Sequence, residues 1–348
     1  MNKDFHYYGT YYAARLAGYS REDAEEIAWA AQMVDDFTES NFGRMFHREN
    51  ITYTCEALSE TAYHELGRLS NVNNSELQKI RRIWVPFHFL PGNMKHELVN
   101  GYGFVTDLKN FSIDRDLPDF KCVCAPNSEL VGKMIQRITG NNTSLLRIGI
   151  AMHVLADTWA HQLFVGSPNA YINDVSDLIE NKHSNASNGT PDIGTAYSVT
   201  YLGHGRAGHL PDIPSQSYQY TPSWSTVKAN VSNPVRFYNA FCQMVDVMVR
   251  LKTQNHDAFM LKDYLPGGID LWDRNANEMI HNRITEVLWS RDEDQSQKWN
   301  EEFRELADPR AFNLNVEITK LNEFEQDAFA HLNFVMNAVE AVVPGYFQ

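Results

Sequence analysis

Apolar residues recur at helical spacing near the start of the chain. Ser20 is followed three residues later by Asp23, an approximate capping box of the kind that opens a helix. The apolar positions after it share one helical face: Ala24, Ile27, Ala28, Ala31 and Val34. Because Gly18 breaks the pattern before them, these residues predict a short helix, a turn and a longer helix that ends near Asp35 and Asp36.

Helical patterns also fill most of the remaining chain. They cover residues 57–83, 128–139, 143–164, 233–264, 270–291, 295–306 and 318–340. Two stretches differ: "IWVPFHFLPG" contains Pro86 and Pro91, which predict an extended or looped segment. Residues 183–224 are rich in Gly, Ser, Asn and Pro, which is typical of a long irregular loop. No run of alternating strand residues, internal repeat or linker is visible, so the pattern predicts one all-α domain, a single large helical domain over residues 1–348.

One predicted helix carries a polar stripe. In "AMHVLADTWAHQLF", residues 151–164, the side chains of His153, Asp157 and His161 follow one another at intervals of four. On a helix they fall within an arc of roughly 80° and about 12 Å of axis. The rest of the helix is apolar nearly all round, as in a buried helix, where polar groups need partners.

Two interpretations of this stripe remain open. The histidines are either core residues that bond carbonyls, with Asp157 pairing one of them, or ligands of a metal, which satisfies imidazole and carboxylate together. A span of about 12 Å is long for one ion, so metal binding implies a second ion with Asp157 near both.

Further donors occur in the long loop and in the first 90 residues. "GHGRAGHLPD" places His204, His209 and Asp212 among glycines that permit unusual backbone angles, as a loop folding over a metal requires. In the same segment, Arg206 is either a phosphate-binding residue or a solvated loop arginine. The other candidates each have a structural explanation as well, as a terminal residue, a helix end and a packed loop histidine: His6, the pair Asp35 and Asp36, and His88.

The charge of the chain narrows the class of partner. The sequence has 44 acidic and 30 basic residues, a formal net charge of −14, which repels the phosphate backbone of extended nucleic acid. The first 20 residues lack the pattern of a signal peptide, and no run approaches the ~18 apolar residues of a membrane-spanning helix. We therefore expect a soluble protein, cytoplasmic as synthesised, with no transmembrane segment.

The motifs together resemble a known family. "DFHYYGTY", "FHFLPG", "HVLADTWAHQ" and "GHGRAGHLPDIP" are similar to recurring blocks of an uncharacterised bacterial group, the DUF6765-type domain. "HVLADTWAH" and the N-terminal histidine before an alanine-rich helix also resemble the all-helical zinc-dependent phospholipase C and S1/P1 nuclease superfamily. The resemblance covers most of residues 4–224, the motif-bearing part, and leaves residues 233–340 as a C-terminal helical part.

The resemblance implies a ligand set and a cofactor. The implied ligands of one to three Zn²⁺ ions, with two the main expectation, are His6, Asp36, His88, His153, Asp157, His161 and His204. Two departures are visible. The superfamily holds a third zinc through the amino group of an N-terminal Trp exposed by cleavage, whereas this chain begins Met1-Asn2, and the spacing from Asp157 to the next histidine is shorter here. In place of the closing ligand pair of the superfamily, the chain offers His204, His209 and Asp212.

The expected function is hydrolysis of a phosphoester by a zinc-dependent enzyme, with a small phosphoester or a phospholipid as substrate. Whichever of Asp35 and Asp36 is not a ligand could orient the attacking water as a general base. Two alternatives stay open: an HD-type phosphohydrolase, suggested by His256 and Asp257, and a non-catalytic, toxin-like binding protein whose metal only ties the loop to the helices.

Overall fold

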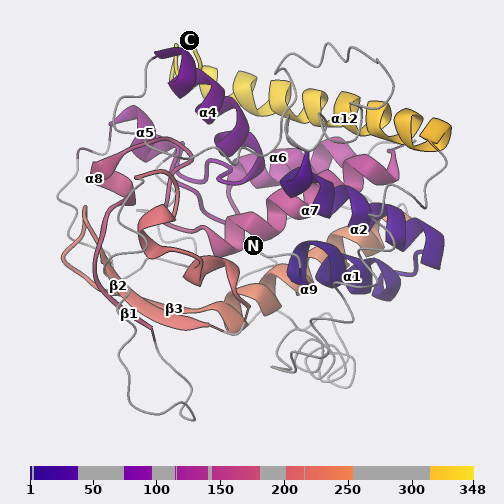
Figure 1. Cartoon of the computed structure of the whole chain (residues 1–348), viewed down its shortest axis with the longest axis horizontal. Coiled ribbons are helices and arrows are strands. Elements are labelled where there is room, and N and C mark those ends of the chain that lie inside the picture. Colours follow the sequence, from indigo (N-terminus) through magenta and orange to yellow (C-terminus); the bar gives the residue numbers. More distant parts are fainter. Residues whose placement is uncertain are drawn as a thin grey trace.

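The computed structural model of the chain describes residues 1, 4–37, 74–95, 114, 116–139, 143–180, 201–214, 216–253 and 314–348. Helices form most of this part, and a small sheet lies to one side of them (Figure 1). Within the described ranges, no helix combines the length and the apolar character that crossing a bilayer requires.

The N-terminal residues form the predicted helix, turn and helix. A single π-helical stretch η1 (Asp4–Gly9) leads into α1 (Thr10–Leu16), and α2 (Arg21–Asp36) follows the turn. Ser20 caps α2, since its side-chain oxygen accepts a hydrogen bond from the backbone N–H of Asp23 at 3.0 Å. Gly18 adopts a φ of +90° in the turn, a conformation that favours glycine.

The central helix is α7 (Leu145–Ala160), which carries the polar stripe. Ser144 caps it, accepting from the backbone N–H of Arg147 at 3.1 Å. The helix ends at Ala160, four residues before the predicted end, and the N–H of His161 closes its last turn on the carbonyl of Asp157 at 2.9 Å. His161 is therefore the residue that follows the helix and does not extend its stripe.

Gly149 sets the distance between α2 and α7. A Cβ atom at this position would lie 2.3 Å from the carbonyl oxygen of Ile27 and 2.6 Å from the Cβ of Ala30. The two helices therefore approach backbone to backbone, which only glycine permits here.

The remaining helices pack around this pair. They are α4 (Asn74–Phe87), α5 (Pro118–Lys121), α6 (Glu129–Ile138), α8 (Ala170–Asn173), α9 (Asn233–Thr253) and α12 (Leu314–Glu340). The helix α4 corrects the prediction of an extended segment, because it runs through Pro86 to Phe87. Pro86 lies in the last turn, and the chain then leaves the helix as the N–H groups of His88 and Phe89 both bond the carbonyl of Trp84. The helices predicted within residues 57–73 and 254–313 lie outside the described residues.

The sheet shows that the all-α prediction was wrong. Three antiparallel strands, β1 (Val175–Glu180), β2 (Ser217–Pro222) and β3 (Ala229–Ser232), pair in the order β1-β2-β3. The strand β2 lies inside the predicted irregular loop, and alternate residues of "SYQYTP" are buried. This alternation spans only six residues among Pro and Ser, too few to stand out from turn-forming sequence. The fold is therefore mixed, helices with a three-stranded sheet.

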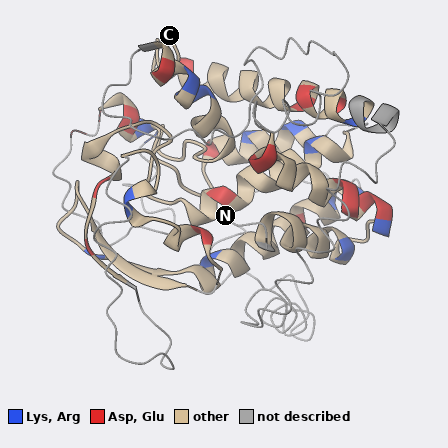
Figure 2. Ribbon diagram, in the orientation of Figure 1, with Lys and Arg blue, Asp and Glu red and all other residues tan. Residues whose placement is uncertain are grey.

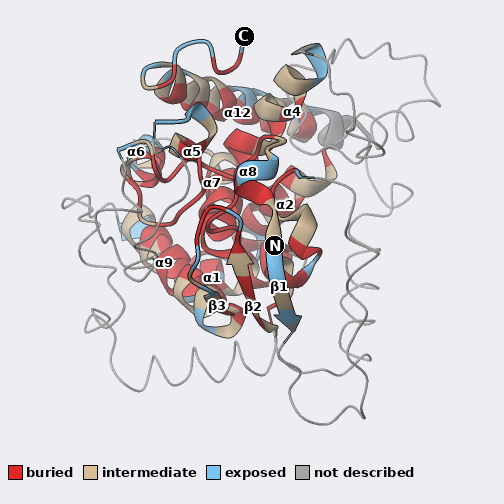
Figure 3. Ribbon diagram, turned by 90° about the vertical axis from the view of Figure 1, so that its left-hand side faces the viewer, coloured by how far each residue is buried: buried red, intermediate tan, exposed pale blue. Residues whose placement is uncertain are grey.

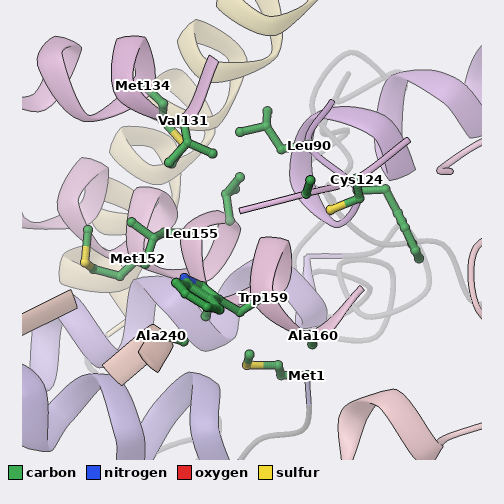
Figure 4. Close-up of a cluster of buried hydrophobic side chains, with 14 of the residues drawn as sticks. Met1, Leu90, Cys124, Val131, Met134, Met152, Leu155, Trp159, Ala160 and Ala240 are labelled. Carbon is green, nitrogen blue, oxygen red and sulfur yellow. The ribbon is translucent and has the colours of Figure 1, made fainter. Parts of the chain in front are cut away.

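The core surrounds α7, whose residues from Ile148 to Ala160 are all buried (Figure 3). Its side chains Met152, Leu155 and Trp159 meet residues of α6 and of α9 (Figure 4). Even the indole N–H of Trp159 is satisfied inside, because it donates to Gln243 Oε1 at 2.7 Å. The prediction of a buried, nearly all-apolar helix is confirmed, and its polar stripe lies within this core.

Candidate metal centre

Histidine and aspartate side chains meet around α7 in three groups, two of which share a residue. The groups are His6, His153 and Asp157; Asp35, His88 and His153; and His161, His204 and Asp212. Within each group the donor atoms lie within 4.8 Å of one another, close enough to bind one cation. We call the first two groups, which share His153, the inner group, and the third the outer group. In Figure 2, Asp and Glu residues are coloured red both in the middle of the molecule, among the helices, and at the outer end of α2.

The inner group is carried by elements that pack on one another. η1 supplies His6, the last turn of α2 supplies Asp35, and the turn after α4 supplies His88. The helix α7 supplies His153 and Asp157, both fully buried. The rings of His6 and His153 stack with centroids 3.7 Å apart and planes 17° apart, so each limits the rotation of the other.

Asp157 presents its two oxygen atoms to different histidines. Oδ1 lies 3.2 Å from Nε2 of His6, while Oδ2 lies 3.2 Å from both Nδ1 of His88 and Nε2 of His153. A carboxylate with this arrangement is suited to bridging two cations.

Asp35 is the more open carboxylate of the inner group. Its side chain is 28% exposed, and its oxygens lie 3.8 Å from His6 Nε2, 3.8 Å from His88 Nδ1 and 3.9 Å from His153 Nε2. Partial burial, together with the charges of Asp157 and Asp212, raises the pKa of its carboxyl to about 7.

The outer group joins the segment 201–214 to the end of α7. Oδ1 of Asp212 lies 3.0 Å from Nε2 of His161 and 3.3 Å from Nε2 of His204. His204 precedes the short 3₁₀ turn η3 (Gly205–Ala207), and Asp212 ends the second such turn, η4 (Leu210–Asp212). The side chains of His204 and Asp212 are 14% and 17% exposed, so this group is closer to solvent than Asp157 and His153 are.

An aromatic wall supports the outer group. The ring of Phe89 stacks on His161, with centroids 4.7 Å apart, and is tilted against His204 at 5.9 Å. Gly203 adopts a φ of +52°, and a Cβ there would lie 2.3 Å from Phe89 Cζ. Phe89 was not among the predicted site residues, although its place beside His88 in "FHF" is a signal that could have found it.

Three histidines share one hydrogen-bonding pattern. The Nδ1–H groups of His153, His161 and His204 donate to the carbonyls of Ala31, His88 and Gly208, each at 2.8 Å. In a neutral imidazole, this bond leaves Nε2 without a proton and with its lone pair directed away from the carbonyl. In all three residues that nitrogen points at an aspartate oxygen 3.0 to 3.3 Å away.

Burial keeps two of these imidazoles neutral. It lowers the pKa of His153 and of His161 to about 4, against the attraction of the neighbouring Asp157. At neutral pH, a lone pair and a carboxylate oxygen therefore face each other, which is repulsive unless a positive charge lies between them. An ordinary His–Asp ion pair, in which the imidazole is protonated, would need no additional positive charge.

The unsatisfied ring of His6 also indicates a bound cation. It is fully buried, and neither of its ring nitrogens has a hydrogen-bond partner of good geometry. Buried polar atoms without partners are rare in proteins and call for an explanation such as an ion. Burial also holds the pKa of His6 well below its ordinary value, so Nε2 can act as a neutral donor to a metal.

The amino group of Met1 reaches the boundary between the two groups. Its nitrogen donates to Asp157 Oδ1 at 2.6 Å and lies 3.3 Å from both Asp212 Oδ1 and His161 Nε2. Burial opposes its charge, but the surrounding aspartates outweigh that effect and raise its pKa to about 10. Positive charge is thus favoured at the point where inner and outer groups meet.

Three predicted site residues lie elsewhere. The carboxylate of Asp36 accepts from Gln32 Nε2 at 3.3 Å and belongs to none of the three groups. The side chain of His209 is 80% exposed, with Nδ1 at 3.8 Å from Asp212 Oδ2. Arg206 forms an ion pair with Asp174 at 2.7 Å and lies over the ring of Tyr201.

One prediction cannot be placed. His256 and Asp257, on which the HD-type alternative depends, lie outside the described residues.

Comparison with known proteins identifies the chain only at the level of its family. No curated protein and no solved structure matches it. Residues 1–340 match DUF6765, described as a family of unknown function. Because this match spans nearly the whole sequence, the chain belongs to the DUF6765 family.

Proposed function

We propose that this protein is a metal-dependent hydrolase of phosphoester bonds, with zinc as its metal. The observation that carries the proposal is the set of three imidazoles, each fixed through Nδ1 to a main-chain carbonyl and each directing Nε2 at an aspartate oxygen. Metal-binding histidines in proteins are oriented by such second bonds.

The donor set favours zinc over harder cations. The inner and outer groups combine five imidazoles with three carboxylates, whereas magnesium and calcium prefer oxygen ligands alone. Two ions are supported best, one in each group, with Asp157 between them. His6, His88, His153 and Asp157 would hold the inner ion, with Asp35 beside them, and His161, His204 and Asp212 would hold the outer one.

Hydrolysis follows from what such a centre supplies when loaded. Bound zinc lowers the pKa of a coordinated water and attracts a phosphoryl group. The residues of the chain then have distinct roles. Asp157 holds the two groups together from a fully buried position, while Asp35, open to solvent and with its pKa near neutrality, is placed to accept a proton from water. Phe89 keeps the imidazoles of the outer group in place.

We extend the proposal to a relationship with the zinc-dependent phospholipase C and S1/P1 nuclease superfamily. The support is the order of donors along the chain, from His6 through the end of α2 to the His153 and Asp157 pair on α7. The three-stranded sheet is a departure from an all-helical fold.

The substrate class follows from charge. A net charge of −14 repels a long polyanion, whereas a molecule with one or two phosphates meets the surface only locally. We propose a small phosphoester or a phospholipid headgroup, and not extended nucleic acid.

The second candidate is a metal with a structural role only. It is favoured by the outer group, since an ion there would fasten the segment 201–214 to the end of α7. Closed coordination by side chains alone would fit this role, and an open position would fit an enzyme.

The deciding experiment measures metal and turnover on the same samples. Elemental analysis of purified protein gives zinc per chain, and chromogenic phosphomonoesters and phosphodiesters are assayed before chelation, after chelation and after zinc is restored. We expect bound zinc and chelator-sensitive turnover that His153→Ala abolishes, while the exposed His209→Ala serves as the matched control. Zinc-loaded protein that is inactive on the whole panel would favour the structural role, and protein that never binds zinc would refute both.

A further inference from the structure

The C-terminal helix α12 contacts two of the helices that carry the inner group, α4 and α7. It lies across α4 and α7 in two perpendicular views (Figures 1 and 3). The apolar side of the contact includes Phe324, Ala328 and Leu332 of α12, packed with Phe87 of α4 and Ile150 of α7.

Two buried polar residues on α12 accompany this apolar contact. Asp327 and His331 are spaced by four, so they lie on the same face of the helix, and each is only 7% exposed. Buried polar side chains need partners, and these two find theirs on different helices.

His331 binds the end of α4. Its Nε2–H donates to the carbonyl oxygen of Pro86 at 2.9 Å, and its ring packs against Phe87 with centroids 5.4 Å apart. Pro86 is two residues before His88, whose imidazole belongs to the inner group. The bond therefore fixes the last turn of α4 at the point from which His88 projects.

Asp327 binds the start of α7. It accepts from Nε and Nη2 of Arg147 at 2.9 and 2.5 Å, and from the hydroxyl of Ser144, the residue that caps α7. A single helix face thus holds the first turn of α7 and the last turn of α4 at once.

We propose that Asp327 and His331 form a brace that positions the inner group, with His331 setting the place of His88 relative to His153. This inference rests on the proposed metal binding, and it adds a function for the C-terminal part of the chain. His331 is a positioning residue, since it reaches His88 only through the backbone.

The brace predicts a specific loss of metal affinity. His331→Leu keeps the approximate volume but removes the donor to Pro86, so we expect zinc affinity, measured against a competing chelator, to fall about tenfold, at the lower end of outer-shell effects. His331→Gln offers an amide N–H in place of Nε2–H and should recover affinity to within about twofold. In cobalt-substituted protein, the absorption bands of the bound ion should change in the Leu variant and return in the Gln variant.

A structural control separates positioning from stability. Val339→Ala, eight residues further along α12 and fully buried in the main core, should lower the melting temperature without changing zinc affinity or the cobalt spectrum. If His331→Leu fails to fold, Asp327→Asn carries the test, because it keeps an acceptor oxygen but loses the charge that pairs Arg147, and we expect a loss of about threefold in affinity.

The outcomes distinguish this inference from the proposed function. Wild-type protein that binds neither zinc nor cobalt would overturn both. Wild-type protein that binds zinc, with affinity unchanged in the His331→Leu and Asp327→Asn variants, would overturn the brace and leave the metal centre standing.

Discussion

The inner and outer groups hold similar donors in different ways. In the inner group, the bond that orients His153 crosses from α7 to the carbonyl of Ala31 in α2, so two packed helices determine it. In the outer group, the bond that orients His204 ends on Gly208, only four residues further along the same segment. The inner group is therefore preorganised by the core, whereas in the outer group only His161 bonds a distant carbonyl, that of His88, and His204 depends on a local turn.

This difference bears on the order in which ions would bind. A site whose donors are already fixed loses less conformational freedom on binding than one whose donors lie on a surface segment. We expect the inner group to retain its ion and the outer group to exchange. The following predictions test that contrast.

Asp157→Asn should have the largest effect, since Asp157 contacts three histidines of the inner group and its Oδ2 lies 3.7 Å from Nδ1 of His161 in the outer group. The amide keeps the shape but has only one acceptor oxygen and no charge, so zinc content should fall in both groups, with affinity reduced by more than about a hundredfold. Elemental analysis of the purified variant measures this. Asp36→Asn is the matched control, and a variant that keeps two ions would show that Asp157 does not connect the groups.

Asp212→Asn should empty only the outer group. One ion should be lost, and protease cleavage within residues 201–214 should increase, because the segment loses its attachment to His161. Mass spectrometry of the digestion products locates the cuts. Equal cleavage in variant and wild type would mean that this segment is held without an ion.

Gly149→Ala should damage the inner group from outside it. The added methyl would meet the carbonyl of Ile27 at 2.3 Å, so α2 and α7 must separate, at a cost of about 3 kcal/mol in the free energy of unfolding. Separation also moves the Ala31 carbonyl away from His153. Chemical denaturation with and without zinc reports both effects, and the exposed Gln136→Ala is the control. Stability within about 0.5 kcal/mol of wild type would contradict the close helix contact.

His331 provides a pH reference outside both groups. Burial lowers its pKa from 6.5 to about 4, so the unfolded chain binds a proton that the folded chain refuses between these values. The stability of metal-free protein should be complete above pH 6.5 and decrease as the pH falls, with His331 accounting for about 2 kcal/mol at pH 5. Denaturation at several pH values should show a smaller decrease in His331→Gln, and parallel curves would contradict a buried neutral imidazole.

His209→Ala should have the smallest effect. The side chain is largely exposed, so zinc content should equal that of wild type, and the free energy of unfolding should stay within about 0.5 kcal/mol of it. Loss of the outer ion in this variant would show that the segment rearranges on binding and brings His209 inward.

Periodicity predicted the helices that carry the inner group, because α2 and α7 have long apolar faces and clear caps. It could also have chosen between Asp35 and Asp36, since Asp35 lies one turn after Ala31 on the face toward α7. The outer group was less accessible to sequence reasoning. Within "GHGRAGHLPD" nothing distinguishes His204 from the exposed His209, because local turns and contacts with Phe89 decide which ring points inward.

The strand β2 shows a second limit. Its partners lie about 40 residues earlier and about 10 residues later in the chain, so pairing depends on tertiary contacts that a short window does not contain. The end of α4 shows a third limit. Pro86 removes only one helical hydrogen bond, because the helix ends one residue later, and a proline in the sequence does not show which side of it the helix ends on.

The contact between Gly203 and Phe89 has an evolutionary consequence. Because a Cβ at position 203 would overlap the aromatic ring, the two positions are not free to change independently. Family members that acquire a side chain at position 203 should carry a smaller residue at position 89, and glycine at the first position should accompany an aromatic ring at the second. A change from one combination to the other would require both substitutions at once, or an intermediate that has glycine at position 203 and a small residue at position 89. Sequences with that intermediate combination would therefore show the order in which the two positions changed.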